Sequence, residues 1–479
     1  MNASNHASLR QPASSRTRQE STIHAPILWP QPLNTIQEIV AIEPCTESTM
    51  QRNHDQLMKA AGVIGKHLVN TAIWNDEGTH CTWLGRRDMH EGKIGPHVQR
   101  NAALGPELYS GTAGVALFLD ALYKKTGNAN FKRVAIAAWE RSVHYLKTNP
   151  SRASAISFYA GDLGLLYVGY RLGYADRATA KRLAPDLDWL LGKLDRGLAM
   201  QHSLDVIGGN AGAIGPLLFL AKRYRVRRCR DIAIQCANEI VNLGTWHGNI
   251  CVWSTPMMHG GAMSRQPLTG LSQGAAGIGM ALLEAYRETG HQTYVTYANG
   301  AFAFEEQLFN KDEGNWIDTR YPHYLRDGNV CGIFKGTWSH GAPGIALAHL
   351  RAKQLNPARA QFHSERLMTA ITTTRKIMQE TLQSKAGDAT LCNGLLGLSD
   401  ILLSYALQES PEQVEECQNQ MLTYLRGFNS PIDLPSGLVC GGYSPSLMNG
   451  LSGIGLHLLR LANSGTIPSV LLLDRETLA

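Results

Sequence analysis

The sequence predicts an all-α protein built from seven repeats, each with one amphipathic outer helix and one apolar inner helix. A Gly-x-x-Gly motif occurs seven times in the 479 residues, an apolar run follows each copy, and amphipathic stretches separate the runs. Self-similarity at a near-constant period is typical of repeat architectures. The motifs begin at Gly111, Gly161, Gly209, Gly274, Gly341, Gly394 and Gly450, at intervals of 48 to 67 residues.

The first 54 residues differ in composition from the rest of the chain. They are rich in Ser, Asn, Gln, Arg and Pro, and they lack the apolar core of a secretory signal. A segment of this composition buries too little apolar surface to fold by itself. We therefore expect residues 1–54 to form a disordered leader and residues 55–479 to form the helical domain.

The apolar runs have the features of buried helices. The run after the first motif, Val115–Tyr123, is followed by Gly127, and the run after the fourth, Ile278–Tyr286, is followed by Gly290. A glycine shortly after the last apolar residue is a common helix stop. Because these runs are apolar on nearly every side, we expect them to be inner helices.

The segments between the apolar runs are amphipathic. In the segment 131–147, Ala135, Trp139 and Val143 recur at helical spacing, whereas charged residues such as Lys132 belong to the opposite face. No strand-type alternation competes with this pattern in the body of the chain. These segments therefore predict outer helices.

Composition and charge narrow the range of partners. Charged residues make up 18% of the chain, and the net charge of +6 includes no Lys/Arg block, so the sequence indicates no nucleic-acid partner. No window reaches the roughly 18 apolar residues that a membrane-spanning helix requires. The nine cysteines are scattered and form no C-x-x-C pair, which is typical of a reducing compartment. We expect a cytoplasmic protein.

The glycine pairs also predict where a site lies. Glycine lets the backbone turn tightly and approach neighbouring helices closely. Helix N-termini leave unpaired N–H groups and a partial positive charge. If the seven inner helices begin on one rim, their first turns form a concave site that faces the axis of the assembly.

The residues beside the glycines carry further motifs. These are the stretches 202–212 (HSLDVIGGNAG), 268–277 (LTGLSQGAAG), 337–344 (TWSHGAPG), 391–397 (LCNGLLG), 447–455 (LMNGLSGIG) and 467–473 (IPSVLLL). In this order they resemble the lanthionine synthetase C-like family, most closely the C-terminal cyclase domain of class II lanthipeptide synthetases. The resemblance runs from about residue 55 to the C-terminus. It implies a seven-fold α/α toroid, in agreement with the repeat count.

The resemblance also implies a chemistry. Cyclases of this family bind a precursor peptide that carries dehydroalanine or dehydrobutyrine, and they add a cysteine thiol across the double bond. Zinc held by two cysteines and one histidine activates the thiol, and an aspartate and a second histidine handle protons. The implied partners are the dehydrated precursor peptide and a separate dehydratase or synthetase that produces it.

This sequence departs from the family at three of these five positions. Ser339 stands at the first zinc-cysteine position, Asn393 at the zinc-histidine position, and Gln273 at the position of the proton-handling histidine, whereas Cys392 and Asp205 are retained. A hydroxyl and an amide are poor zinc ligands in proteins, and an amide relays no proton near neutral pH. We therefore expect no zinc and no other cofactor.

The residues around the substituted site have structural alternatives. His340 neighbours the lost ligand position, but its side chain should point away from the direction of residue 339, so we do not expect it to replace the ligand. Cys392 is interpretable as a small buried apolar residue. Asp205 is interpretable as a helix cap.

Two functions stay open on the sequence. The first is a zinc-independent cyclase that forms the carbon–sulfur bond by aligning the thiol with the dehydro residue. Class III lanthipeptide synthetases, whose cyclase domains lack the zinc ligands, permit this interpretation. The second is a non-catalytic protein that binds the modified peptide or scaffolds a separate dehydratase or cyclase. The first requires an acid or base such as Asp205 within reach of the ligand, whereas the second requires only shape and hydrogen bonding.

Overall fold

The computed structural model describes residues 47–90, 97–149, 156–174, 176–198, 203–259, 262–384, 387–438 and 442–472. Of the predicted leader, residues 1–54, only residues 47–54 are among them, and these residues open the first helix, α1 (Glu47–Asn70). Asn53 in this part of the helix is buried and donates a hydrogen bond to Asn419 at 2.9 Å. The predicted boundary at residue 55 therefore falls inside α1, because the start of the helix already packs on the body.

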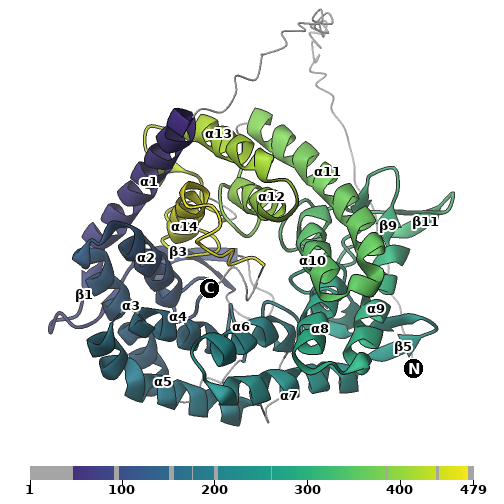
Figure 1. Ribbon diagram of the computed structural model, residues 1–479, viewed down its shortest axis with the longest axis horizontal. Coiled ribbons are helices and arrows are strands. Elements are labelled where there is room, and N and C mark those ends of the chain that lie inside the picture. The colour runs from purple at the N-terminus through teal and green to yellow at the C-terminus, as the bar shows by residue number, and fades with distance from the viewer. Residues whose placement is uncertain are drawn as a thin grey trace, which may run out of the picture. The chain divides into compact units, whose positions relative to one another are not determined.

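The described residues are mostly helical, as the sequence predicts. Figure 1 shows an inner and an outer ring, with even-numbered helices inside and odd-numbered helices outside. The inner helices are α2 (Thr112–Thr126), α4 (Leu163–Tyr174), α6 (Asn210–Arg223), α8 (Ala275–Thr289), α10 (Ala342–Leu355), α12 (Leu395–Glu409) and α14 (Leu451–Ala462). With α1, the outer helices are α3 (Ala129–Thr148), α5 (Arg177–Gly197), α7 (Arg227–Leu243), α9 (Gln292–Gln307), α11 (Ala360–Ser384) and α13 (Val414–Leu425).

Packing between neighbouring helices closes the ring. Each inner helix packs against the next inner helix, and α14 packs against α2 to complete the circle. The first outer helix, α1, packs against α14, so segments at opposite ends of the described chain lie side by side. Burial follows the sequence pattern: α2 is buried from Thr112 to Leu122, whereas α5 buries only one stripe, which includes Leu183, Leu187, Leu190 and Leu194.

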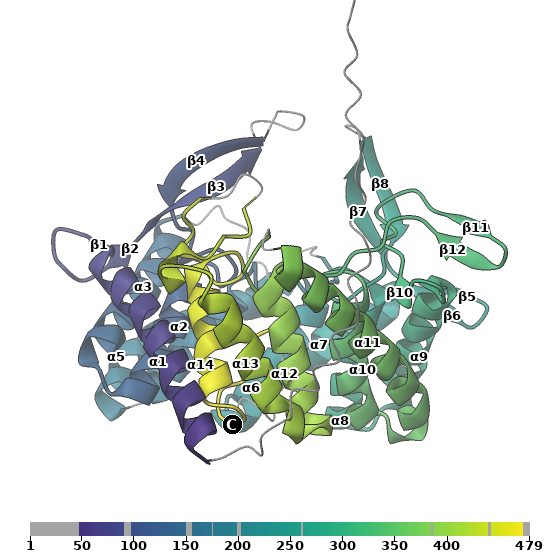
Figure 2. The same ribbon diagram turned by 90° about the horizontal axis from the view of Figure 1, so that it is seen from above.

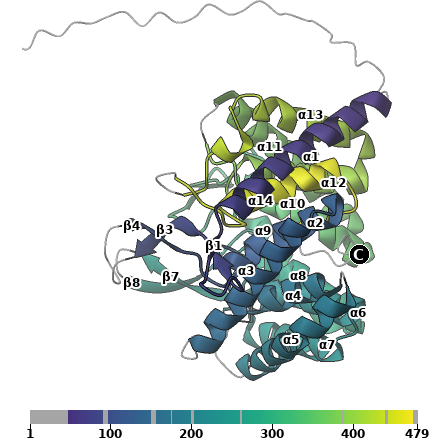
Figure 3. The same ribbon diagram turned by 90° about the vertical axis from the view of Figure 1, so that its left-hand side faces the viewer.

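Short hairpins lie in the connections, although the sequence showed no strand-type alternation there. They pair β1 (Ile73–Trp74) with β2 (Cys81–Thr82), β3 (Leu84–His90) with β4 (His97–Ala103), β5 (Thr245–His247) with β6 (Ile250–Val252), β7 (Ser254–His259) with β8 (Ala262–Pro267), β9 (Phe309–Asn310) with β10 (Asn315–Trp316), and β11 (Tyr324–Arg326) with β12 (Asn329–Cys331). Each pair is antiparallel and two-stranded. Hairpins β3–β4 and β7–β8 project from the same end of the ring (Figures 2 and 3). The remaining elements are three short 3-10 helices, η1 (Pro357–Arg359), η2 (Pro411–Gln413) and η3 (Pro431–Asp433).

The inner helices begin next to tightly packed backbone. Gly341 precedes α10 with φ of +85°, and a Cβ atom there would lie 1.8 Å from the carbonyl oxygen of Lys335. At Gly212, in the first turn of α6, an added Cβ atom would likewise lie 1.8 Å from the carbonyl oxygen of Val206. Side chains are excluded at both positions, since real Cβ atoms do not approach carbonyl oxygens so closely.

Candidate functional site

The turns before the inner helices are joined to one another around the ring. The joining residues stand two positions before the first glycine of each motif: Tyr109, Tyr159, Ile207, Ser272, Ser339, Cys392 and Met448. Backbone hydrogen bonds link Tyr109 N to Tyr159 O at 3.0 Å, Ala160 N to Ile207 O at 3.4 Å, Ile207 N to Ser272 O at 3.1 Å, Ser272 N to Ser339 O at 3.2 Å, Cys392 N to Met448 O at 3.0 Å, and Met448 N to Tyr109 O at 3.0 Å. We call each connection between two neighbouring turns a step. Among the described residues, only the step from Ser339 to Cys392 is made by side chains instead of backbone groups, with Ser339 Oγ 3.6 Å from Cys392 Sγ.

Cys392 lies in this step between turns. Its thiol accepts a hydrogen bond from the hydroxyl of Tyr109 at 2.9 Å, and the residue is 3% exposed. Burial raises the pKa of the thiol, although the contacts with Tyr109 and Ser339 oppose this effect. Without a metal ion beside it, Cys392 is therefore a protonated thiol at neutral pH, which is a weak nucleophile.

The residues at the implied zinc positions do not fit zinc. Ser339 is buried and contacts Cys392 through its hydroxyl, whereas Asn393 is exposed. A zinc site needs three or four soft or imidazole ligands that converge on one point. Among the described residues, no three His, Cys, Asp or Glu side chains come together in this way. We derive no chemical step through a metal at this site.

His340 turns toward a different neighbour from Ser339. Its Nδ1 lies 3.1 Å from the carbonyl oxygen of Thr269 in the preceding turn, while Ser339 contacts Cys392 in the following turn. Burial and then the nearby Arg320 guanidinium lower the pKa of His340 to about 4. The imidazole is therefore neutral at neutral pH, and its hydrogen bond directs it away from the sulfur.

Asp205 and Gln273 lie in neighbouring turns, since the amides of Val206 and Ile207 both donate to the carbonyl oxygen of Ser272. The Asp205 carboxylate accepts a hydrogen bond from the hydroxyl of Ser203 and another from the backbone N–H of Gly208, the latter at 2.6 Å. Burial raises its pKa, and these hydrogen bonds oppose the effect. Both carboxylate oxygens are thus engaged within the turn that precedes α6, and the side chain of Gln273 is partly exposed.

Sequence reasoning missed Tyr109, which contacts the retained cysteine. Its position in the sequence could have indicated this contact. Tyr109 stands two residues before the first glycine of its motif, as Ser339 and Cys392 do in theirs. The contact itself follows from closure of the ring, which brings the first repeat beside the last ones. Burial raises the pKa of Tyr109 well above its ordinary value, so the phenol stays neutral and donates.

A cationic and aromatic group lies close to His340. Arg320 pairs with Asp318 at 2.6 Å, and both influence the ionisation of the imidazole. Arg320 and Lys335 lie 5.9 and 5.3 Å from the ring centre of Tyr321, which is 38% exposed. An exposed aromatic ring beside two cations is a surface on which a peptide can pack.

Of three solved structures compared with this chain, that of nisin cyclase agrees with the helical architecture. The solved structure of nisin cyclase is similar with a TM-score of 0.58 and 17% identity, over 90% of this chain and 99% of that chain. The alpha-1,6-mannanase GH76A of Salegentibacter sp. HEL1_6 gives a TM-score of 0.41 at 11% identity, over 85% of this chain and 99% of that one. An unsaturated glucuronyl hydrolase from Streptococcus agalactiae gives 0.40 at 12% identity, over 88% and 93%.

The helices were compared with membrane spans, and the sequence was compared with known protein families. Among the described residues, every helix is too short or too polar to span a membrane. The family described as lanthionine synthetase C-like protein matches residues 102–472. The chain therefore belongs to the lanthionine synthetase C-like family.

Proposed function

We propose that this protein is a zinc-independent cyclase of lanthipeptide biosynthesis, which binds a dehydrated, cysteine-containing precursor peptide at the ring of turns. The observation that carries the proposal is the step between Ser339 and Cys392, where Tyr109 donates to the sulfur of the retained cysteine. At the position where the family places its metal, the side chains of Tyr109, Ser339 and Cys392 form hydrogen bonds with one another. The zinc ligands are replaced, whereas the surrounding framework remains.

The reaction follows from what the described groups are able to do. The substrate thiol adds to the β-carbon of the dehydro residue, so one carbon–sulfur bond forms and the thiol proton ends on the α-carbon. No oxidant or reductant is required. With Gln273 an amide and Asp205 engaged in its own turn, the protein contributes mainly by aligning the two groups. The exposed Tyr321, with Arg320 and Lys335 beside it, gives the peptide a contact surface.

The proposal includes the fold of the protein, the source of its peptide and its cellular compartment. We infer that the two rings of helices form a seven-fold α/α toroid with a Gly-x-x-Gly turn before each inner helix. A separate dehydratase or synthetase supplies the peptide in its dehydrated form. We expect the protein to work in the cytoplasm, an expectation supported by the described cysteines, all of which are free thiols.

A second candidate function is non-catalytic peptide binding, with the protein as a scaffold for a separate dehydratase or cyclase. The engaged carboxylate of Asp205 and the protonated thiol of Cys392 favour it, because neither group is free to move a proton. The two candidates share the peptide and differ in whether it leaves the protein with new thioether rings.

The test uses full-length protein, EDTA and a fluorescent precursor peptide with dehydrated residues and free cysteines. Anisotropy measures binding, and mass spectrometry after thiol alkylation counts the cysteines that ring formation has consumed. The proposal predicts saturable binding, together with thiol loss faster than in the peptide alone. Binding without faster thiol loss would support the scaffold. Equal affinity for the same peptide with unmodified serines, or no binding, would contradict both candidates.

A further inference from the structure

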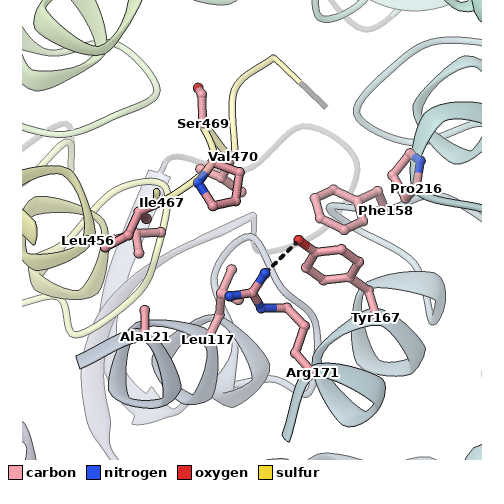
Figure 4. A pocket seen from close by; sticks show the side chains of 11 residues that line it. Leu117, Ala121, Phe158, Tyr167, Arg171, Pro216, Leu456, Ile467, Ser469 and Val470 are labelled. Carbon is pink, nitrogen blue, oxygen red and sulfur yellow. Dashed lines mark hydrogen bonds between the residues drawn. The ribbon is translucent and has the colours of Figure 1, made fainter. Parts of the chain in front are cut away.

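The interior of the ring contains a small cavity on the inner side of α2, α4, α6 and α14, closed by the C-terminal segment 467–470 (Figure 4). Its volume is about 20 Å³. The lining is mostly apolar: Leu117, Ala121, Phe158, Tyr167, Arg171, Pro216, Leu456, Ile467, Pro468, Ser469 and Val470. Helix residues, the C-terminal segment and Phe158 from the turn before α4 form the cavity, and Cys392, Ser339 and Tyr109 do not line it.

Two polar groups point into this apolar space, the guanidinium of Arg171 and the hydroxyl of Tyr167 (Figure 4). The Arg171 side chain is 14% exposed, and its one hydrogen bond among the described residues is a long one, from Nη1 to the Tyr167 hydroxyl at 3.4 Å. Its Nε is buried without a hydrogen-bond partner. A guanidinium has five N–H donors, and the one on Nε is thus available to an acceptor inside the cavity.

The Tyr167 hydroxyl shows the same shortage of acceptors. It accepts from Arg171, but its own hydrogen has no acceptor among the described residues. Tyr167 is 2% exposed, and buried donors are costly when they remain unpaired. Both groups therefore lack an acceptor on the same side of the cavity.

The charges around Arg171 also favour a negatively charged ligand. The carboxylate nearest to Arg171 is Asp120, whose Oδ2 lies 3.8 Å from Nε, beyond hydrogen-bond distance. The same oxygen is 2.7 Å from Nζ of Lys124, so one buried carboxylate faces two cations. Lys124 is 30% exposed, so solvent screens its charge, whereas the Arg171 guanidinium is 14% exposed and shares Asp120 beside an apolar wall, where desolvated charge is expensive.

We infer that this cavity is a binding site for a single halide ion such as chloride, held by Arg171 and Tyr167. Its volume is slightly above what one water molecule requires, so larger anions are excluded. The anion accepts hydrogen bonds from Nε of Arg171 and from the phenol of Tyr167, and its charge pairs with the guanidinium. It thereby stabilises the contact of α2 and α4 with the C-terminal segment. This inference is independent of the proposed function.

The test is thermal unfolding of the full-length protein at constant ionic strength, with gluconate as the large reference anion. Sodium chloride, sodium formate or sodium acetate then replaces gluconate stepwise, and the two carboxylates show whether the response is specific to the halide. The site predicts a saturable rise in Tm with chloride and no such rise with acetate, and an equal rise with all three salts would contradict it. Arg171→Met should weaken the apparent affinity about tenfold or more, because a charge-assisted hydrogen bond is lost. Arg223→Met is the matched control, since Arg223 packs on Tyr174 and does not line the cavity.

A second variant and a direct measurement cover the case in which Arg171→Met does not fold. Tyr167→Phe keeps the ring and removes only the hydroxyl, and it should weaken the anion response severalfold. Crystals soaked in bromide should show an anomalous peak within hydrogen-bond distance of Arg171. The inference would be overturned by equal Tm responses in Tyr167→Phe, Arg223→Met and the natural protein, or by a cavity that contains only water after the soak.

Discussion

At the residue scale, the candidate site is defined by the contacts of Cys392, whose sulfur lies 2.9 Å from the Tyr109 hydroxyl and 3.6 Å from Ser339 Oγ. The motif positions identify Ser339, Cys392 and Asn393 from sequence, since each has a fixed place relative to a glycine. The hydrogen bond from Tyr109 to Cys392 was not predictable, because 283 positions separate the two residues and only ring closure brings them together.

The engagement of Asp205 is a second residue-scale result. The sequence left this carboxylate open as a cap or as a functional group, and the structure places hydrogen bonds from Ser203 and Gly208 on its two oxygens. Such local bonds, one from a side chain and one from the backbone, depend on the path of the chain, which a motif does not specify.

Glu305 allows a pH-dependent test of a buried carboxyl group. Its Oε1 accepts from the backbone N–H groups of Gly270 and Ala276 at 2.9 and 2.8 Å, so this outer-helix residue holds the turn that carries Gln273. Burial raises the pKa of Glu305 from 4.5 to about 8, although the two hydrogen bonds oppose the shift. Folding therefore favours the protonated form, and stability is lost as pH rises from about 4.5 through about 8.

The variant Glu305→Gln keeps the accepting oxygen and removes the titration. Relative to the natural protein, it should therefore gain free energy of unfolding as pH rises from about 5 to about 8. Urea unfolding at several pH values measures this difference. Glu313→Gln, at an exposed position, is the control. A difference between Glu305→Gln and the natural protein that does not change with pH would contradict the account.

At the element scale, the helices were predictable and the hairpins were not. The inner helices follow from long apolar runs and the outer helices from one buried stripe, such as Leu183, Leu187, Leu190 and Leu194 in α5. The strands are two to seven residues long and lie in connections. In β3, Leu84–His90, charged residues interrupt any alternation, so pairing with β4 had no clear signal in the sequence.

The start of α10 gives an element-scale prediction. Gly341→Ala forces a side chain into positive φ and against the carbonyl oxygen of Lys335, so the backbone must move. We expect a loss of about 3 kcal/mol or more in the free energy of unfolding. Gly290→Ala, at the end of α8, also has positive φ but meets open space, and it should cost only about 1–2 kcal/mol.

Urea denaturation of the two glycine variants measures both values. The comparison separates backbone conformation from close approach, because both glycines have positive φ and only Gly341 contacts backbone. Equal losses in the two variants would show that the packing at the start of α10 is not as tight as the structure describes.

At the scale of the whole molecule, the family resemblance implied a ring, in agreement with the repeat count, but the groups that close the ring were not apparent from the sequence. Inside the ring, buried Asp400 pairs with His457 and Arg460, each at 3.1 Å, and accepts from the hydroxyl of Ser469. Burial would raise the pKa of Asp400, but Arg460 and His457 outweigh it, and the pKa is lowered. This network joins α12, α14 and the C-terminal segment.

The C-terminal segment is fixed by further long-range bonds. The hydroxyl of Tyr159 donates to the carbonyl oxygen of Val470 at 2.7 Å, and the indole of Trp338 donates to that of Leu471 at 3.2 Å. Both donors belong to motif turns. The end of the described chain is thus bound to turns from distant repeats, an arrangement that local sequence patterns do not encode.

The central claim is that this member of the lanthionine synthetase C-like family keeps the ring of turns without a zinc site. The most direct test is elemental analysis of full-length protein purified without a metal-affinity tag, beside the double variant Ser339→Cys with Asn393→His. The account predicts that the natural protein holds far less than one zinc per chain, whereas the double variant binds close to one. Near-stoichiometric zinc in the natural protein would contradict the account and would show that other side chains complete the site.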